Sequence, residues 1–344
     1  MSAVTARTIE IADDRRLMLV ERSVPEPGPG QVEIEIAYCG ICGSDLHFRD
    51  IPALFPSGTV PGHEFSGAIS AVGEGAGDWR VGDRVSVLPF AQCGECALCL
   101  AGEEQVCPHA VANGVGLGTG RPGGYAERVI VDARMLFALP DELDDAAAAL
   151  AEPVAVGVHA VAKAGVEPDA PVVVVGAGPI GLVTALVLRA QGFERVVLIS
   201  RNAARARAAQ ELGLHTVGAE DAATHALTAL NGDGPAAVFE CAGTPSAATL
   251  ALDLVRPLGR VVLVGIALEG LTLPATAIVF KEAEHVGALV YRRGEFAAAI
   301  DLLAQGRIPT EGLISDIVPL ERAEAMFQAL TAPDNAHMKV LLEP

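Results

Sequence analysis

A run of four valines followed by a glycine-rich turn constrains the fold of this chain more than any other stretch. Residues 172–175 are β-branched without interruption, which is typical of a strand buried on both faces of a parallel sheet. The glycines that follow have the spacing G-x-G-x-x-G, and an apolar helical segment continues to residue 189. Such glycines permit a tight turn, let the backbone approach a pyrophosphate and let the helix pack closely on the strand. We expect this helix N-terminus to hold the phosphates of a dinucleotide, through Gly176, Gly178, Pro179, Ile180 and Gly181.

Strands and helices continue to alternate after this turn. Further strand-like apolar runs lie at 195–200, 236–240 and 259–265, with helical segments between them. This repetition predicts an α/β fold with a doubly wound parallel sheet, which binds ligands at the carboxyl ends of its strands. Positions near those ends complete the expected cofactor site: Ser200, Arg201, Arg205, Cys241, Val264 and Gly265.

The beginning of the chain has a different pattern. Residues 1–35 alternate apolar and polar side chains, and turn residues at 25–30 separate the runs, which is typical of a small β-rich domain. An acidic, alanine-rich segment at 141–150 indicates a helix start and a domain junction. Glu152-Pro153 then opens a further helix, because proline suits a first-turn position.

Four of the seven cysteines lie close together, with the spacing C-x2-C-x2-C-x7-C. Four thiolates can surround one tetrahedral ion and leave no position for a substrate, so this spacing predicts a structural zinc site. An iron–sulfur cluster is the alternative metal centre. Disulfides are not expected in a chain that we predict to be cytoplasmic. The predicted ligands are Cys93, Cys96, Cys99 and Cys107.

A second candidate metal site has mixed donors. Cys42, His63 and Glu64 offer sulfur, nitrogen and oxygen in two glycine-flanked turns. This mixture is typical of a catalytic zinc ion that keeps one coordination position open. Taken singly, a cysteine is usually a small buried apolar residue, and a histidine is usually a polar residue with its hydrogen bonds satisfied. The combination favours a ligand set, whereas Cys39 and Cys241 are not needed as ligands and are expected to be small buried residues.

Length and composition exclude several classes of protein. A chain of 344 residues is long enough for two domains, and a hydrophobic content of 51% is that of a globular protein. The formal net charge of −19 argues against nucleic-acid partners, because a phosphate backbone would be repelled. No apolar run is long enough to span a membrane, and the N-terminus lacks a signal-peptide pattern. We therefore predict a cytoplasmic protein with neither membrane nor nucleic-acid partners.

Taken together, these motifs resemble those of the zinc-dependent medium-chain alcohol dehydrogenases, especially the branch of sorbitol, butanediol and threonine dehydrogenases. The resemblance covers essentially the whole chain. It rests on five motifs in a fixed order: Cys39-Gly-Ile-Cys42-Gly-Ser-Asp-Leu-His47, Pro61-Gly-His63-Glu64-Phe-Ser-Gly67, the four cysteines, Glu152-Pro153 and Gly176-Ala-Gly178-Pro-Ile-Gly181.

The family implies two domains. A GroES-like β-rich catalytic domain would comprise residues 1–153 and 291–344 and include the structural zinc lobe at 93–107. A Rossmann domain would comprise residues 154–290. The family also implies a homodimer or homotetramer formed through residues 259–291.

By the same resemblance, Cys42 and His63 bind the catalytic zinc, and Glu152 stands at the position of the family's other protein ligand. Glu64 either coordinates directly or exchanges with Glu152 and a water. Zinc polarises a substrate oxygen. The implied reaction is therefore hydride transfer between a secondary alcohol or polyol, or the matching ketone, and a nicotinamide cofactor.

Ser44, Asp45 and His47, which follow the cysteine ligand Cys42, match further parts of the family's site. Ser44 matches the hydroxyl that begins a proton relay, and His47 matches its outer end. Asp45 matches the carboxylate that orients the histidine ligand and makes it more basic. Turn capping is the alternative role for Ser44 and Asp45.

The cofactor site departs from the NAD pattern at one position. NAD enzymes of this fold carry an acid about twenty residues beyond the fingerprint, where it bonds the ribose hydroxyls. This chain has Ser200 there, followed by Arg201. No carboxylate repels a 2′-phosphate, and Arg201 or Arg205 would pair with it. We therefore predict a preference for NADP over NAD.

Three other functions compete with this interpretation. One is a biosynthetic dehydrogenase for a bulky natural product, whose pocket residues 48–57 would shape. Another is a non-catalytic, cofactor-binding redox sensor that holds only the structural zinc. The complete set of ligands and relay residues argues against the sensor, since a binding module needs no relay. A zinc-free relative of the quinone reductases is disfavoured because it would lack both ligand sets.

Overall fold

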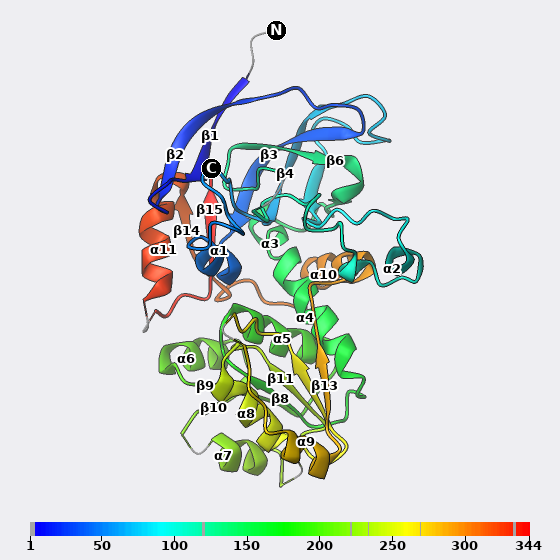
Figure 1. Ribbon diagram of the computed structural model, residues 1–344, viewed down its shortest axis with the longest axis vertical. Helices are drawn as coiled ribbons and strands as arrows, with labels where there is room; N and C mark the ends of the chain where they lie inside the picture. The colour runs from blue at the N-terminus through cyan, green and yellow to red at the C-terminus, as the bar shows by residue number, and fades with distance from the viewer. Residues whose placement is uncertain (1–3, 119–120, 221, 233, 269, 333–334) are drawn as a thin grey trace. The chain divides into compact units, whose positions relative to one another are not determined.

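A computed structural model describes residues 4–118, 121–220, 222–232, 234–268, 270–332 and 335–344. The chain forms two compact units. The first contains Met1–Glu152, Arg292–Ala304 and Ile314–Pro344, and the second contains Pro153–Tyr291 and Gln305–Leu313. Each unit has its own sheet and core, which confirms the predicted combination of a β-rich domain and an α/β domain (Figure 1).

The second unit is built on a six-stranded parallel sheet with the order β10-β9-β8-β11-β12-β13. The chain runs outward from the central strand β8 through β9 to β10, and then crosses to β11 on the other side of β8. The order therefore reverses between β8 and β11, the position where doubly wound sheets bind their ligands. The strands are β8 (Val172–Val175), β9 (Val196–Ser200), β10 (His215–Gly218), β11 (Ala237–Glu240), β12 (Arg260–Leu263) and β13 (Glu284–Gly287).

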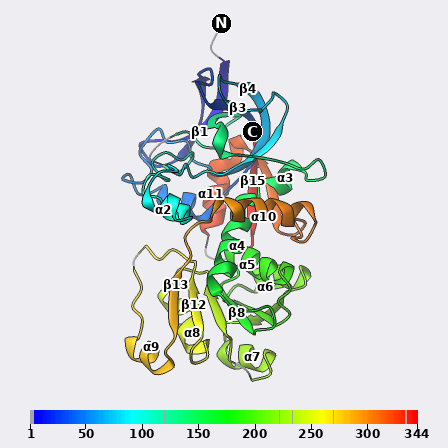
Figure 2. The same ribbon diagram turned by 90° about the vertical axis from the view of Figure 1, so that its right-hand side faces the viewer.

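Helices cover the sheet because its strands are apolar on both faces. Val173, Val197, Val238 and Val261 point to one face and pack with apolar residues of α7 and α8. Helix α5 packs on β8 and β9. Figure 2 shows α5, α6, α7 and α8 around the strands of this sheet. Burying these valines stabilises the sheet by about 1.5–3 kcal/mol for each side chain. The helices are α4 (Ala151–Ala164), α5 (Pro179–Ala190), α6 (Ala203–Glu211), α7 (Ala222–Ala229), α8 (Pro245–Leu254) and α9 (Ala275–Lys281).

The first unit is built on a sheet with the order β14-β15-β3-β4-β5-β7, in which β6 also pairs with β3, and on the separate hairpin β1-β2. The central strands β3 and β4 are antiparallel, whereas β14 and β15 arrive from the far end of the chain and extend the sheet beside β3. The strands are β1 (Val4–Ile11), β2 (Leu17–Val24), β3 (Gln31–Gly40), β4 (Glu64–Val72), β5 (Arg84–Val87), β6 (Arg128–Asp132), β7 (Leu136–Ala138), β14 (Ile314–Pro319) and β15 (Lys339–Glu343).

Short helices connect these strands, and two longer ones follow the second unit. The helices are α1 (Gly43–Phe48), α2 (Ala97–Leu100), α3 (Asp145–Ala148), α10 (Arg293–Ala304) and α11 (Ala323–Thr331), with 3-10 turns at Glu104–Val106, Ala133–Met135 and Leu320–Arg322. Among the described residues, no helix is both long enough and apolar enough to cross a membrane.

The structure departs from the sequence expectations in a few places. Gln305–Leu313, which we expected with the terminal part of the catalytic domain, groups with the second unit. There the Arg307 guanidinium donates to the Ala190 carbonyl at the end of α5. The helices α1 and α9 and the strand β14 were not predicted, because α1 and β14 have only six residues each and α9 lies mostly at the surface.

Candidate active site and cofactor site

Helix α1 places the first group of predicted site residues. Cys42 follows the end of β3 and caps this helix, and its backbone N–H donates to Oδ2 of Asp45 at 3.2 Å. Ser44 and His47 are three residues apart on α1 and so lie on the same face, with Ser44 half-buried and His47 exposed. This arrangement is compatible with a relay that ends in solvent.

Two more predicted ligands come from the neighbouring strand. His63 directly precedes β4 and Glu64 is its first residue, and both side chains are buried. One donor atom from each of Cys42, His63 and Glu64 lies within 4.8 Å of the other two. The fold therefore brings a sulfur, a nitrogen and an oxygen donor together. Glu152, on the first turn of α4, is also buried but lies outside this group of three.

A buried carboxylate supports the group. Asp45 is fully buried, its Oδ2 accepts the Tyr125 hydroxyl at 2.6 Å, and its Oδ1 lies 3.5 Å from Nδ1 of His63. A carboxylate beside Nδ1 leaves Nε2 of the imidazole as the nitrogen for a metal. Burial, followed by the charge of Asp45, raises the pKa of Tyr125 well above its usual value, so its hydroxyl stays protonated as a donor.

The electrostatics around His63 also suit a cation. Burial by itself lowers the pKa of His63, but Asp45 and Cys42 oppose it and raise the pKa well above its usual value. The pocket thus stabilises positive charge at the imidazole. A metal ion bound by Cys42 and His63 would supply that charge in place of the proton, and its binding would release protons from the site.

Glu64 has a partner, Lys339, that no sequence motif predicted. Both of its carboxylate oxygens accept from Nζ of Lys339, at 2.7 and 2.6 Å, and both side chains are buried. Burial lowers the pKa of Lys339, but the charges of Glu64, Cys42 and Glu152 raise it overall, so the ammonium stays charged.

The four-cysteine lobe has the dimensions of a tetrahedral site. Its Sγ atoms are separated by 3.9 Å for Cys93 and Cys99, 3.9 Å for Cys96 and Cys107, and 3.6 Å for Cys107 and Cys93. Thiolates about 2.3 Å from one zinc ion would be about 3.8 Å apart. Backbone N–H groups of Glu95 and Cys96 lower the pKa of Cys93 to about 6, so one thiolate is available near neutral pH. The residues present fit a structural zinc ion.

The lobe is tied to a distant helix. Glu103, within the lobe, accepts from Nη2 of Arg292 at 2.7 and 2.8 Å, and Glu104 accepts from the backbone N–H of Arg293 at 2.6 Å. These contacts hold the lobe against the start of α10. They join residues that are 189 positions apart in the chain.

The glycine turn of the second unit has the geometry that dinucleotide binding requires. Gly176 has φ +105°, which a residue with a side chain rarely adopts. A Cβ at Gly181 would overlap the Gly176 carbonyl oxygen, so only glycine lets α5 start this close to β8. Nη1 of Arg205 lies 3.8 Å from the position that a Cβ would occupy if Gly178 had a side chain. A positive group therefore lies beside the turn.

The remaining predicted cofactor residues lie at the same edge of the sheet. Ser200 ends β9, and its hydroxyl donates to the Asn202 carbonyl at 2.9 Å while accepting from the Asn202 N–H at 3.2 Å. Arg201 is exposed. Cys241 follows β11, and Val264 and Gly265 follow β12. Glu240, which the sequence analysis did not identify, is buried and accepts from the backbone N–H groups of Ala242 and Gly243, fixing the turn after β11.

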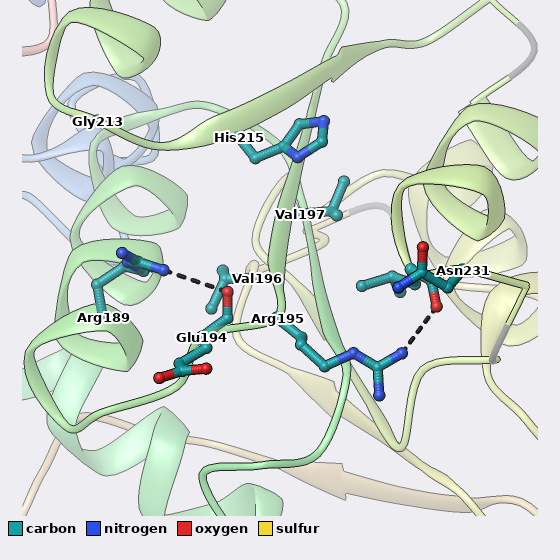
Figure 3. A pocket seen from close by; sticks show the side chains of 9 residues that line it. Arg189, Glu194, Arg195, Val196, Val197, Gly213, His215 and Asn231 are labelled. Carbon is teal, nitrogen blue, oxygen red and sulfur yellow. Dashed lines mark hydrogen bonds between the residues drawn. The ribbon is translucent and has the colours of Figure 1, made fainter.

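A cavity of about 160 Å³ in the second unit is separate from these sites. Figure 3 shows Arg189, Arg195 and His215 around it. Val196 and His215 begin β9 and β10, so the cavity lies at the amino ends of these strands, opposite the glycine turn. Arg189 and Arg195 donate to the backbone carbonyls of Glu194 and Leu230. We assign this cavity no role in catalysis.

Comparison with known proteins agrees with this geometry. Residues 28–141 match the family described as "Alcohol dehydrogenase GroES-like domain", and residues 179–305 match "Zinc-binding dehydrogenase". A sorbitol dehydrogenase of Halalkalibacterium halodurans is 32% identical over 94% of each chain. An alcohol dehydrogenase structure from Escherichia coli, complexed with NADH, is 30% identical with a TM-score of 0.89 over 99% of each chain. A zinc-binding dehydrogenase from Sinorhizobium meliloti, bound to NADP, is 28% identical with a TM-score of 0.90 over 99% of this chain and 100% of the other.

The chain belongs to the zinc-dependent medium-chain alcohol dehydrogenase family. It is an alcohol dehydrogenase, an oxidoreductase that acts on CH–OH groups with a nicotinamide cofactor. The expected fold, family and reaction class are thereby confirmed. Neither a biosynthetic enzyme for a bulky natural product nor a non-catalytic redox sensor is favoured.

The role of Tyr125 yields a first prediction. Tyr125→Phe removes the hydroxyl that donates to Asp45, and a hydrogen bond to a charged group contributes about 1.5–3 kcal/mol. Asp45 would then orient His63 less firmly, and we expect zinc at Cys42 and His63 to bind about 10–100-fold more weakly. Losses of this size are typical when the residues that orient a metal ligand are changed. Zinc retained per chain, measured against increasing chelator, checks this expectation.

Tyr38→Phe is the matched control, because that hydroxyl bonds to Glu343 at 3.2 Å, away from Asp45. It should leave zinc retention unchanged. Equal retention in Tyr125→Phe and wild type would contradict the supporting role of Tyr125.

Proposed function

We propose that this protein interconverts a secondary alcohol or polyol and the matching ketone, with two zinc ions per chain and with NADP preferred over NAD. The observation that carries the proposal is the convergence of Cys42, His63 and Glu64 in the first unit. A bound zinc ion would act as a Lewis acid on the substrate oxygen. The nicotinamide would accept or donate the hydride. The similarity to a sorbitol dehydrogenase supports the polyol as the substrate class.

Cys42 and His63 would hold the catalytic zinc together with a carboxylate. That carboxylate is either Glu64, which lies within 4.8 Å of both, or Glu152, which is buried and stands at the position of the family's other ligand. Asp45 would orient His63. A mixed set of sulfur, nitrogen and oxygen donors suits zinc and leaves a position open for substrate. Cys93, Cys96, Cys99 and Cys107 would hold the structural ion.

A proton must also leave the site when an alcohol is oxidised. Ser44 would accept it through its hydroxyl, and His47 would pass it to solvent. The half-buried position of Ser44 and the exposure of His47, one turn further along α1, support this direction of transfer.

Activity tests this assignment directly. Initial rates with NADP and with NAD would be followed by nicotinamide absorbance, against secondary alcohols, vicinal diols, sugar alcohols and their ketones. We expect turnover that a zinc chelator abolishes, and two zinc ions per chain. Cys42→Ser should lose both turnover and one ion, whereas Cys39→Ala, which changes a cysteine of the same motif, should keep both. A wild-type chain with one zinc ion and no turnover would overturn the proposal.

The preference for NADP rests on the second unit. Ser200 brings no negative charge to the end of β9, and the proximity of Arg205 to Gly178 supports a contact with a cofactor phosphate. Arg201 or Arg205 would pair with the 2′-phosphate of NADP.

Ser200→Asp introduces the missing carboxylate and should shift preference toward NAD. We expect the ratio of kcat/KM for NADP to that for NAD to fall by about tenfold or more, since each 1.4 kcal/mol of lost interaction is a factor of ten. Ser200→Ala removes the hydroxyl without adding charge and should leave the ratio nearly unchanged. An unchanged ratio in Ser200→Asp would refute the assignment of cofactor preference.

We also propose a homodimer or homotetramer formed through residues 259–291. Strand β13 is an edge of its sheet, and large apolar side chains are exposed in and beside this segment, including Ile266 at 62% and Phe280 at 84%. Exposed apolar patches of this kind mark interaction sites. A cytoplasmic location stays a prediction, supported by the thiolate ligands, which need a reducing compartment.

Light scattering measures this assembly. Phe280→Glu should reduce the molar mass of the particle to that of a smaller assembly, because it places a charge in the expected interface. Val81→Glu changes a side chain that is 67% exposed in the first unit and should leave the mass unchanged. A wild-type protein with the mass of a single chain would contradict the proposal.

A further inference from the structure

Glu240, the last residue of β11, has one bonded and one unbonded carboxyl oxygen. The side chain is fully buried, and its Oε1 accepts from the backbone N–H groups of Ala242 and Gly243 at 2.9 and 2.8 Å. Its Oε2 is buried too, and within the described residues it has no hydrogen-bond partner. A buried anionic oxygen without a partner is costly, so a proton on Oε2 stabilises the group. Burial accordingly raises the pKa of Glu240, although the backbone N–H groups of Ala242, Gly243 and Thr244 oppose the rise.

The turn that this side chain fixes is in contact with the turns on both sides of it. Strand β11 lies between β8 and β12. On the β8 side, a Cβ at Gly176 would lie 3.0 Å from Cβ of Ala242. On the β12 side, a Cβ at Gly265 would overlap the backbone nitrogen of Gly243 and lie 2.9 Å from Oε2 of Glu240. The three turns therefore pack backbone against backbone, and a displacement of Ala242 or Gly243 would displace the turns beside them.

The main chain of Glu240 adds a second connection. Its carbonyl oxygen accepts from the N–H groups of Val264 and Gly265, at 2.9 and 2.8 Å, where the chain leaves β12. One residue thus fixes the turn after β11 through its side chain and the turn after β12 through its main chain. Any residue at this position would supply the carbonyl oxygen. A change of side chain therefore tests the hold on the turn after β11 by itself.

We propose that Glu240 is a positioning residue for the nicotinamide cofactor, an uncharged hydrogen-bond acceptor that sets the turn after β11 and, through it, the spacing of the glycine turn and the turn after β12. Doubly wound sheets hold their ligands at this edge, where the strand order reverses. The inference rests on the proposed function, because it takes the glycine turn as the cofactor site. Glu240 acts through the backbone of its neighbours and not by contact with the cofactor.

Cofactor affinity tests this role. The Kd for NADPH and for NADH would be measured from the change in nicotinamide fluorescence during titration of the zinc-loaded protein. Glu240→Leu replaces the carboxyl group by an apolar group of similar size and removes the acceptor. We expect both Kd values to rise about 10–100-fold, because small displacements of positioning groups cost up to about 100-fold. The two cofactors should be affected alike, since the proposed contacts of the 2′-phosphate follow β9 and not β11.

Steady-state rates separate positioning from a loss of folded protein. In Glu240→Leu the KM for the cofactor should rise with its Kd, while kcat at saturating cofactor stays near that of wild type. A variant that is only partly folded would instead lose kcat at an unchanged KM, and that result would overturn the inference.

Glu240→Gln is the conservative variant. Its amide oxygen can accept the same two N–H groups, and its NH2 group takes the place of the protonated Oε2. We therefore expect Kd values that match those of wild type, whereas a group that acts through its charge would lose its effect. Weak binding by Glu240→Gln, equal to that of Glu240→Leu, would refute the inference, and this comparison with wild type remains if Glu240→Leu does not fold.

Lys281→Met is the matched control for lost stability in the same unit. The Lys281 ammonium donates to the carbonyls of Leu252, Asp253 and Val255, at the opposite end of α8 from the turn after β11. This variant should lower the melting temperature and leave both Kd values unchanged. If it weakened cofactor binding as much as Glu240→Leu, the effect would not belong to the turn and the inference would fail.

The wild-type titration separates this inference from the proposed function. Wild-type protein that binds neither NADPH nor NADH would defeat the proposed function and the inference with it. Wild-type protein that binds a cofactor no more tightly than Glu240→Leu does would defeat the inference alone.

Discussion

The candidate catalytic site depends on the contacts of one buried carboxylate, that of Asp45. It accepts from the backbone of Cys42 and from the hydroxyl of Tyr125, and it lies beside the imidazole of His63. These partners come from three separate parts of the chain. A carboxylate without water is costly unless it is hydrogen-bonded or paired. The contacts of Asp45 therefore bring the backbone of Cys42, the ring of Tyr125 and the imidazole of His63 around one carboxylate.

The second unit depends on a different constraint, the close approach of backbone to backbone. Helix α5 can begin directly behind β8 only because Gly176 and Gly181 lack side chains. The reversal of strand order between β8 and β11 opens space at this edge of the sheet. Glu240 shapes the facing turn through its bonds to two backbone N–H groups. Steric limits thus fix the backbone of the glycine turn, whereas a buried carboxylate positions the candidate metal ligands.

Much of this architecture was predictable because local patterns carry it. The valines of β8, the glycine spacing and the cysteine spacing each specify a structure within a few residues of sequence. Lys339 and Tyr125 were missed for the opposite reason. Each acts on a residue far away in the chain, and no periodicity shows which carboxylate a buried lysine or tyrosine will meet. A hint was present in Lys339, since a lysine that leads into an apolar strand has to find a partner if it is buried.

The pair of Glu64 and Lys339 also has a consequence for how the protein is made. The two residues are 275 positions apart, with the whole second unit synthesised between them. Domains generally fold as units as the chain emerges from the ribosome. Through most of synthesis Glu64 therefore has no counter-charge from β15, while Cys42 and His63 are already present. The ion pair, and the pairing of β15 with β3 that brings Lys339 to it, can therefore form only after the last residues of the chain have been synthesised.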